Sequence, residues 1–163
     1  MLIKTLVCLF ALSGVSFFIG CSASYAPPSL LPRTFVYNIA GNQEALTAKV
    51  VGILKALDYD IAMDDPGTGL VRVMAREIKV LPDECDCGKL YGKSLVSDPA
   101  TTIKILIEIY IQDGRIRFVT NYSFSHKNRN GRVDRVGECI SPGVYERQLV
   151  DLMLKQPVYQ SQP

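Results

Sequence analysis

The sequence contains no tryptophan and a single histidine, His126, among its 163 residues. Histidine is the side chain most often used for acid–base catalysis near neutral pH, so the sequence has few residues suited to such catalysis. The formal net charge is only +2, with both signs mixed along the chain. A nucleic-acid-binding face would be strongly basic. No His-Glu-x-x-His run, Gly-rich phosphate loop or Ser-His-Asp order is present. The sequence therefore predicts a protein that is not an enzyme, needs no cofactor and does not bind nucleic acid.

The N-terminus has the pattern of an export signal. A positively charged start, Met1–Lys4, precedes an uncharged apolar run at residues 5–19. This run is shorter than the ~20 residues that a membrane-spanning helix needs, and it suits a signal peptide. The motif Phe18-Ile19-Gly20-Cys21 then resembles the lipobox of bacterial lipoproteins, although Leu is usual at the first position. The alternatives are a plain secretory signal or an uncleaved anchor.

The lipobox resemblance implies a processing route and a location. The signal would be cut before Cys21, which would carry fatty acyl chains, and Ser22 in place of Asp implies sorting to the periplasmic face of the outer membrane. We therefore expect a signal peptide at 1–20 and a lipidated Cys with a Pro-rich tether at 21–32. One domain at 33–156 and a flexible tail at 157–163 complete the chain. The membrane is thus a predicted partner through the N-terminal lipid.

The stretch from Thr102 to His126 predicts a β-hairpin. Isoleucine occupies every odd position from 103 to 111, and large apolar residues occupy the even positions 116, 118, 122 and 124. Asp113-Gly114 between the two runs favours a tight type I′ turn. A two-residue loop pairs Ile111 with Ile116 and places all these side chains on one face. Such a face is stable only when other elements cover it.

The remaining pattern predicts those covering elements. Apolar residues at helical spacing follow Asn42, and a second helix follows Ser141-Pro142 and ends before Pro157. Further strands are expected at 33–39, 59–63 and 70–78, with an irregular stretch at 81–100. The order β-α-β-β-β-β-α predicts an α+β two-layer sandwich: a mostly antiparallel five-stranded sheet with two helices on one face.

This order behind a lipobox resembles, in topology, the small α/β accessory lipoproteins of outer-membrane assembly machines. Examples are the helix-grip domains of the β-barrel assembly lipoproteins and the plug lipoprotein of lipopolysaccharide export. The resemblance implies a membrane-anchored, non-catalytic binding or assembly module with an envelope protein partner. The residues alone leave a second hypothesis open, a carrier in which helices and sheet part to hold a lipid or other apolar ligand.

Three of the five cysteines remain once Cys8 leaves with the signal and Cys21 takes lipid. In an oxidising compartment this odd number predicts one disulfide and one spare thiol. Cys139 paired with Cys87 or Cys85 would close a loop of about fifty residues, worth ~4 kcal/mol. Gly88 leaves room beside Cys87 and favours it. The alternatives add His126 to the three cysteines as a zinc site, or make Cys-x-Cys redox-active.

Basic residues gather after the hairpin, around a second tight turn at Asn130-Gly131. The default interpretation is a solvated face. The functional interpretation is contact with anionic lipid headgroups, lipopolysaccharide phosphates or an acidic partner. The candidate residues for this anionic-partner patch are Lys127, Arg129, Arg132 and Arg135.

Overall fold

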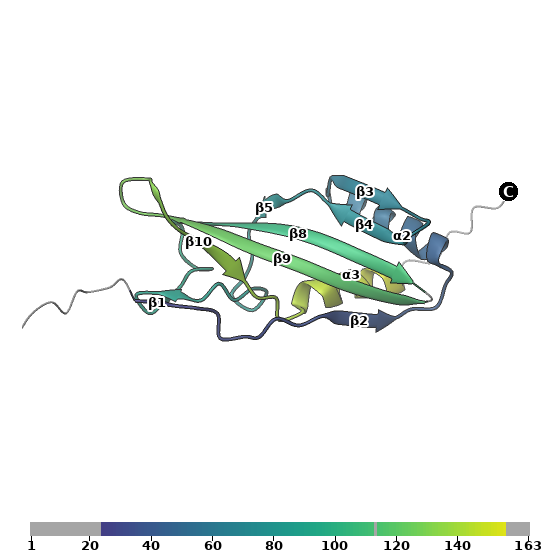
Figure 1. Cartoon of the computed structure of the whole chain (residues 1–163), viewed down its shortest axis with the longest axis horizontal. Helices are drawn as coiled ribbons and strands as arrows, with labels where there is room; N and C mark the ends of the chain where they lie inside the picture. Colours follow the sequence, from purple (N-terminus) through teal and green to yellow (C-terminus); the bar gives the residue numbers. More distant parts are fainter. Residues whose placement is uncertain (1–23, 113, 156–163) are drawn as a thin grey trace, which may run out of the picture.

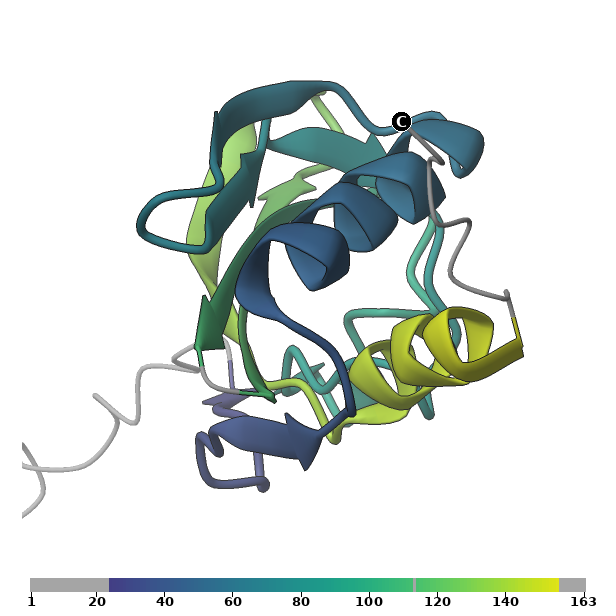
Figure 2. The same cartoon turned by 90° about the vertical axis from the view of Figure 1, so that its right-hand side faces the viewer.

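A computed structural model of the chain describes residues 24–112 and 114–155. The predicted signal peptide, Cys21, Asp113 and the tail at 157–163 lie outside these residues. The fold is α+β, as predicted, with a mostly antiparallel sheet and two helices (Figure 1). Figure 2 shows α2 and α3 on the same side of this sheet, so among the described residues no helix covers its other face.

The predicted hairpin is confirmed and forms the centre of the sheet. Strand β8 spans Thr101–Gln112 and β9 spans Arg115–Lys127. Their register pairs Ile111 with Ile116 and Ile103 with Phe124, as a two-residue connection requires. Gly114 has φ +72°, a left-handed conformation that suits such a tight turn. The inner-face isoleucines from 105 to 116 are at most 1 % exposed, so the alternating pattern did identify the core.

The main sheet has seven strands, not the five predicted. Five of them follow the order β10 (Val133–Cys139), β9, β8, β4 (Leu70–Val73) and β3 (Ile61–Asp65). Strand β2 (Phe35–Asn38) pairs with the first part of β9, and β5 (Arg76–Ile78) pairs with β8. All these pairings are antiparallel.

Two sequence predictions account for the wrong strand count. The single strand expected at 70–78 divides into β4 and β5 at Met74 and Ala75, which belong to neither strand. Strand β10 was not predicted because its residues are mostly polar and exposed, and alternate too weakly to mark a strand. It adds to β9 beyond the part that β2 covers.

A separate three-stranded sheet was also not predicted. It consists of β1 (Tyr25–Ala26), β6 (Lys89–Leu90) and β7 (Lys93–Ser94). The stretch at 81–100 is therefore partly regular. More importantly, β1 belongs to the segment predicted as a Pro-rich tether at 21–32, and the structure pairs and bonds this segment to the domain from residue 24 onward.

The two helices follow the predicted pattern. Helix α2 spans Gln43–Ala56, and the side chain of Asn42 caps it by accepting from the Ala45 N–H at 2.7 Å. Helix α3 spans Val144–Lys155 and therefore begins two residues after the predicted first position, Pro142. Their buried stripes cover the inner face of the hairpin; the largely apolar set is Leu46, Val50, Val51, Ile53, Leu54, Leu149, Val150 and Met153.

Candidate functional site

A cleft of about 810 Å³ lies between the β6–β7 turn and the β9–β10 connection. Figure 1 shows this connection at the end of the molecule where β1 lies. One wall comes from the β6–β7 turn and the other from residues 127–130 of the β9–β10 connection. Most of the residues that line it have polar side chains, and the acidic and basic ones are Lys93, Asp98, His126, Lys127, Arg129 and Asp134. Two residues of the predicted anionic-partner patch, Lys127 and Arg129, therefore line a concave surface.

His126 is a structural residue of this cleft. It is 8 % exposed and lies at the end of β9. Its Nδ1 is 2.9 Å from Oδ1 of Asp134, and its Nε2 is 3.5 Å from Oδ2 of Asp98. Both ring nitrogens thus face carboxylates of the protein itself. This arrangement ties the segment before β8 to the start of β10, and it leaves neither nitrogen directed at a substrate.

The four predicted patch residues divide into two groups. Lys127, Arg129 and Arg132 are exposed around a turn that Asn128 organises by accepting from the Arg132 N–H at 3.2 Å. Arg135 is instead half-buried, with its guanidinium 4.7 Å from the centre of the Tyr25 ring. Such a cation–π contact holds Arg135 against the first described strand. The exposed basic surface is therefore the turn, and Arg135 joins it to β1.

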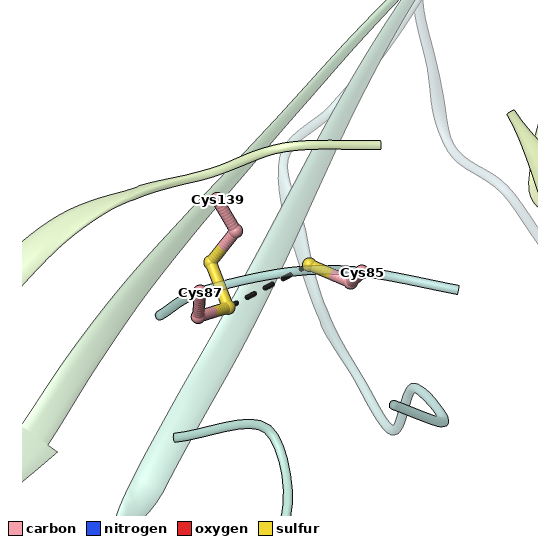
Figure 3. A group of neighbouring side chains, drawn as sticks. All are labelled: Cys85, Cys87 and Cys139. Carbon is pink, nitrogen blue, oxygen red and sulfur yellow. Dashed lines mark hydrogen bonds between the residues drawn. A yellow bond between two sulfur atoms is a disulfide. The ribbon is translucent and has the colours of Figure 1, made fainter. Parts of the chain in front are cut away.

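The structure contains a disulfide between Cys87 and Cys139, the pairing that the sequence analysis preferred (Figure 3). An isolated antiparallel bridge between Asp86 and Ile140 sets the register here. It places Cys87 directly opposite Cys139, with 4.1 Å between their Cα atoms, and Cys85 opposite Ser141. Register, rather than the room beside Gly88, explains why Cys87 is the partner.

Cys85 remains as a free, buried thiol beside this disulfide, and its Sγ is 3.6 Å from the Sγ of Cys87. Burial raises the pKa of the Cys85 thiol to about 12, and the carboxylates of Asp86 and Glu84 add to the rise. The reactive form of cysteine is the thiolate. Cys85 is therefore held in its unreactive state, which argues against redox chemistry at Cys-x-Cys.

The structure does not assemble the alternative four-ligand zinc site. The three sulfurs lie within 4.8 Å of one another, and they are the only group of potential metal ligands among residues 24–112 and 114–155. His126 is not part of this group, because its nitrogens face Asp98 and Asp134. Two of the three sulfurs are bonded to each other. As the disulfide stands, the cluster offers one thiol and no histidine.

The first described residues are fastened to the domain, which no sequence motif had indicated. Oδ2 of Asp86 accepts hydrogen bonds from the Ser29 N–H at 2.8 Å, the Ser29 hydroxyl at 2.9 Å and the Leu30 N–H at 3.3 Å. Burial raises the pKa of Asp86, but these bonds and one from the Gly88 N–H outweigh it and lower the pKa below its ordinary value. Asp86 is thus a charged attachment point for the N-terminal segment.

Gly88 completes this attachment. Its φ is +80°, and a Cβ added there would lie 2.2 Å from the carbonyl oxygen of Ala26. Only glycine lets the backbone of the N-terminal segment approach so closely. Further along, the Ser24 carbonyl accepts from the Tyr91 N–H at 3.1 Å. In the sequence, Asp86 is marked only by its place between two cysteines, which gives no sign of this role.

Comparison with protein-family models and with curated proteins gives no match for this chain. Within residues 24–112 and 114–155, none of the helices has the length and apolarity that crossing a bilayer requires.

Proposed function

We propose that this protein is a lipid-anchored lipoprotein of the bacterial envelope, on the periplasmic face of the outer membrane, acting as a non-catalytic binding or assembly module. The support at the N-terminus is the sequence Phe18-Ile19-Gly20-Cys21 after a short apolar run. The observation that carries the proposal is the fastening of residues 24–30 by Asp86 and Tyr91. A domain fixed so close to its lipidated Cys21 is held at the membrane surface in a defined orientation.

The proposed partner-binding surface is the face of the sheet opposite α2 and α3 (Figure 2). A groove of about 430 Å³ runs over its central strands and is bordered by residues 32–34. Leu106 and Val119 are half-buried there, and Val36, at 54 % exposure, extends the apolar surface along β2. Half-buried apolar side chains between polar neighbours are typical of protein-binding surfaces. An envelope protein is the partner that this face fits.

Two measurements test the proposal. Mass spectrometry of the N-terminal peptide should find Cys21 acylated, and Cys21→Ala should release the protein from membranes. A photo-crosslinking residue at Val119, on the open face, should give one defined adduct in intact cells. The same residue at Ala48, exposed on α2, is the matched control and should give none. An unmodified Cys21, or equal crosslinking from both positions, would contradict the proposal.

The carrier hypothesis is less well supported. Ile105, Ile107 and Ile116 on the inner face are completely buried, and Leu46 and Leu54 of α2 are 1 % exposed. These large side chains occupy the space between helices and sheet that an apolar ligand would need. Native mass spectrometry of the purified protein should therefore show the mass of the chain and its acyl groups, with no further ligand.

The metal hypothesis retains one specific observation, the three clustered sulfurs. Thiolates bind zinc readily, but Cys87 and Cys139 must first be reduced. We expect the oxidised protein to contain less than stoichiometric zinc. Elemental analysis before and after treatment with a thiol reductant tests this directly, and stoichiometric zinc in the protein as purified would favour the metal hypothesis.

A further inference from the structure

The N-terminal chain leaves the domain at the same end as the candidate cleft. Ser24 is bonded to Tyr91 in the β6–β7 turn, and β1 pairs with β6. Cys21 precedes Ser24 by three residues, and three residues span at most ~10 Å. If Cys21 carries the acyl chains, as the proposed function holds, the β6–β7 turn lies within about 10 Å of the point where the chain enters the membrane. This inference rests on that proposed anchor.

Basic side chains are concentrated at this end. Figure 1 shows the β9–β10 connection projecting from the end at which β1 lies. Lys89 and Lys93 flank the β6–β7 turn and are exposed, as are Lys127, Arg129 and Arg132 on the other side of the cleft. The acidic residues of the cleft, Asp98 and Asp134, both face His126. The charge offered outward is therefore predominantly positive.

Tyr91 is an exposed aromatic residue in a costly conformation. It is 70 % exposed, and its φ is +52° in the β6–β7 turn, followed by Gly92 at +77°. A tight turn with two positive φ values favours Asn, Asp or Gly, and a bulky residue there is an outlier. Packing does not explain the choice, because most of the side chain is in solvent. Strain of this kind is kept where a side chain has a function.

We propose that this end of the domain docks on the anionic headgroups of the membrane that holds its acyl chains. Lys89, Lys93 and the basic β9–β10 turn contact lipid phosphates, and Tyr91 enters the headgroup layer. Tyrosine is favoured at that depth because its ring is apolar and its hydroxyl is polar. Val133, which is 53 % exposed at the start of β10, adds apolar contact on the other side of the cleft.

The electrostatic attraction between basic side chains and anionic lipid sets how strongly a substitution should weaken docking. One Lys or Arg near an anionic surface changes the docking equilibrium about fivefold, so removing two should weaken it about 25-fold. Arg129→Ala with Arg132→Ala is the test pair. Arg115→Ala with Arg117→Ala is the matched control, because both are exposed on β9 but lie near its other end, beside the β8–β9 turn.

The experiment uses the mature protein with Tyr91→Trp, which gives a single tryptophan because the chain has none. The protein is incorporated into vesicles of phosphatidylglycerol and phosphatidylcholine, or of phosphatidylcholine alone. We expect blue-shifted emission, and quenching by a headgroup-level spin label, in the anionic vesicles only. The response should weaken in high salt and in the test pair, and it should persist in the control pair.

The docking surface and the acylation of Cys21 can be refuted independently of each other. Emission that is the same in both kinds of vesicle, or in test and control pairs, overturns the docking even when Cys21 is acylated. The mass of the N-terminal peptide from the same sample reports acylation separately. If the Tyr91→Trp protein is unacylated and its emission still responds to phosphatidylglycerol, the anchor is refuted and the docking surface is supported.

Discussion

Replacing Cys87 or Cys139 by alanine tests the account of the sulfur cluster most sharply. The disulfide joins residues 52 positions apart. On the chain-entropy model, a closed loop of this length contributes about 4 kcal/mol to the free energy of unfolding. We expect Cys87→Ala and Cys139→Ala each to lower that free energy by about this amount, because the remaining cysteines do not form a substitute bridge.

The reason that Cys85 cannot replace Cys87 lies in the strand register. Cys87 faces Cys139 directly, whereas Cys85 is two residues further along, opposite Ser141, and lies diagonal to Cys139. Diagonal positions in antiparallel strands are separated by ~7–8 Å, beyond the ~7 Å between Cα atoms that a disulfide tolerates. Although the Sγ atoms of Cys85 and Cys139 lie within 4.8 Å of each other, we therefore expect the backbone geometry to prevent a bond between them.

Urea denaturation and thiol counting by maleimide mass shift measure the two consequences. Cys85→Ala is the control, since it keeps the disulfide and loses only about 1 kcal/mol for one small buried side chain. Cys87→Ala should expose Cys85 and Cys139 as labelled thiols after unfolding. If this variant instead shows no free thiol and nearly wild-type stability, Cys85 has taken over the bridge and the register argument is refuted.

Three further variants probe the attachment, the turn and the last helix. Asp86→Asn should lower the hydrogen-exchange protection of Ser29 about fivefold, or about 1 kcal/mol after solvent screening. Because folding lowers the pKa of Asp86, the stabilisation by its carboxylate is present above about pH 4 and lost below it. The hydrogen-exchange protection of Ser29 should therefore also fall below about pH 4, and unchanged protection would contradict this. Tyr91→Asn should raise the free energy of unfolding by about 1 kcal/mol, because Asn accepts a left-handed conformation, and no gain in urea would argue against strain. Ser141→Ala should cost about 1–3 kcal/mol in thermal unfolding, because fully buried Glu146 loses the hydroxyl that donates to its Oε2 at 2.9 Å; a loss below about 0.5 kcal/mol would contradict this.

The hairpin and the two helices could be predicted because local signals agree there. The alternation of the isoleucines, the Asp-Gly turn and the cap at Asn42 each indicate the element that is found. Tertiary packing in these parts therefore favours the same secondary structure as the local sequence does. Strand β10 could not be predicted in this way. It has one buried residue, Cys139, and its pairing is with β9, far from any local signal.

The candidate site was predicted only in part, for a similar reason. Charge is visible in the sequence, so Lys127, Arg129 and Arg132 were identified. The other half of the surface depends on contacts between distant segments, such as that of Ser24 with Tyr91. Tyr91-Gly92, with Lys89 and Lys93 nearby, was the signal in the sequence that could have indicated this surface. In a tight turn with glycine at the second position, the first position is usually Asn, Asp or Gly, so a tyrosine there is unusual.

The attachment of residues 24–30 limits how far the domain can lie from the proposed anchor at Cys21. A flexible tether at 21–32 would let the domain range over ~20 Å. Asp86 and the Tyr91 turn hold the segment from Ser24 onward, and Cys21 precedes Ser24 by three residues, which span at most ~10 Å. So short a link fixes which end faces the lipid. If Cys21 is the anchor, as we propose, the basic cleft is the end of the domain that faces the lipid.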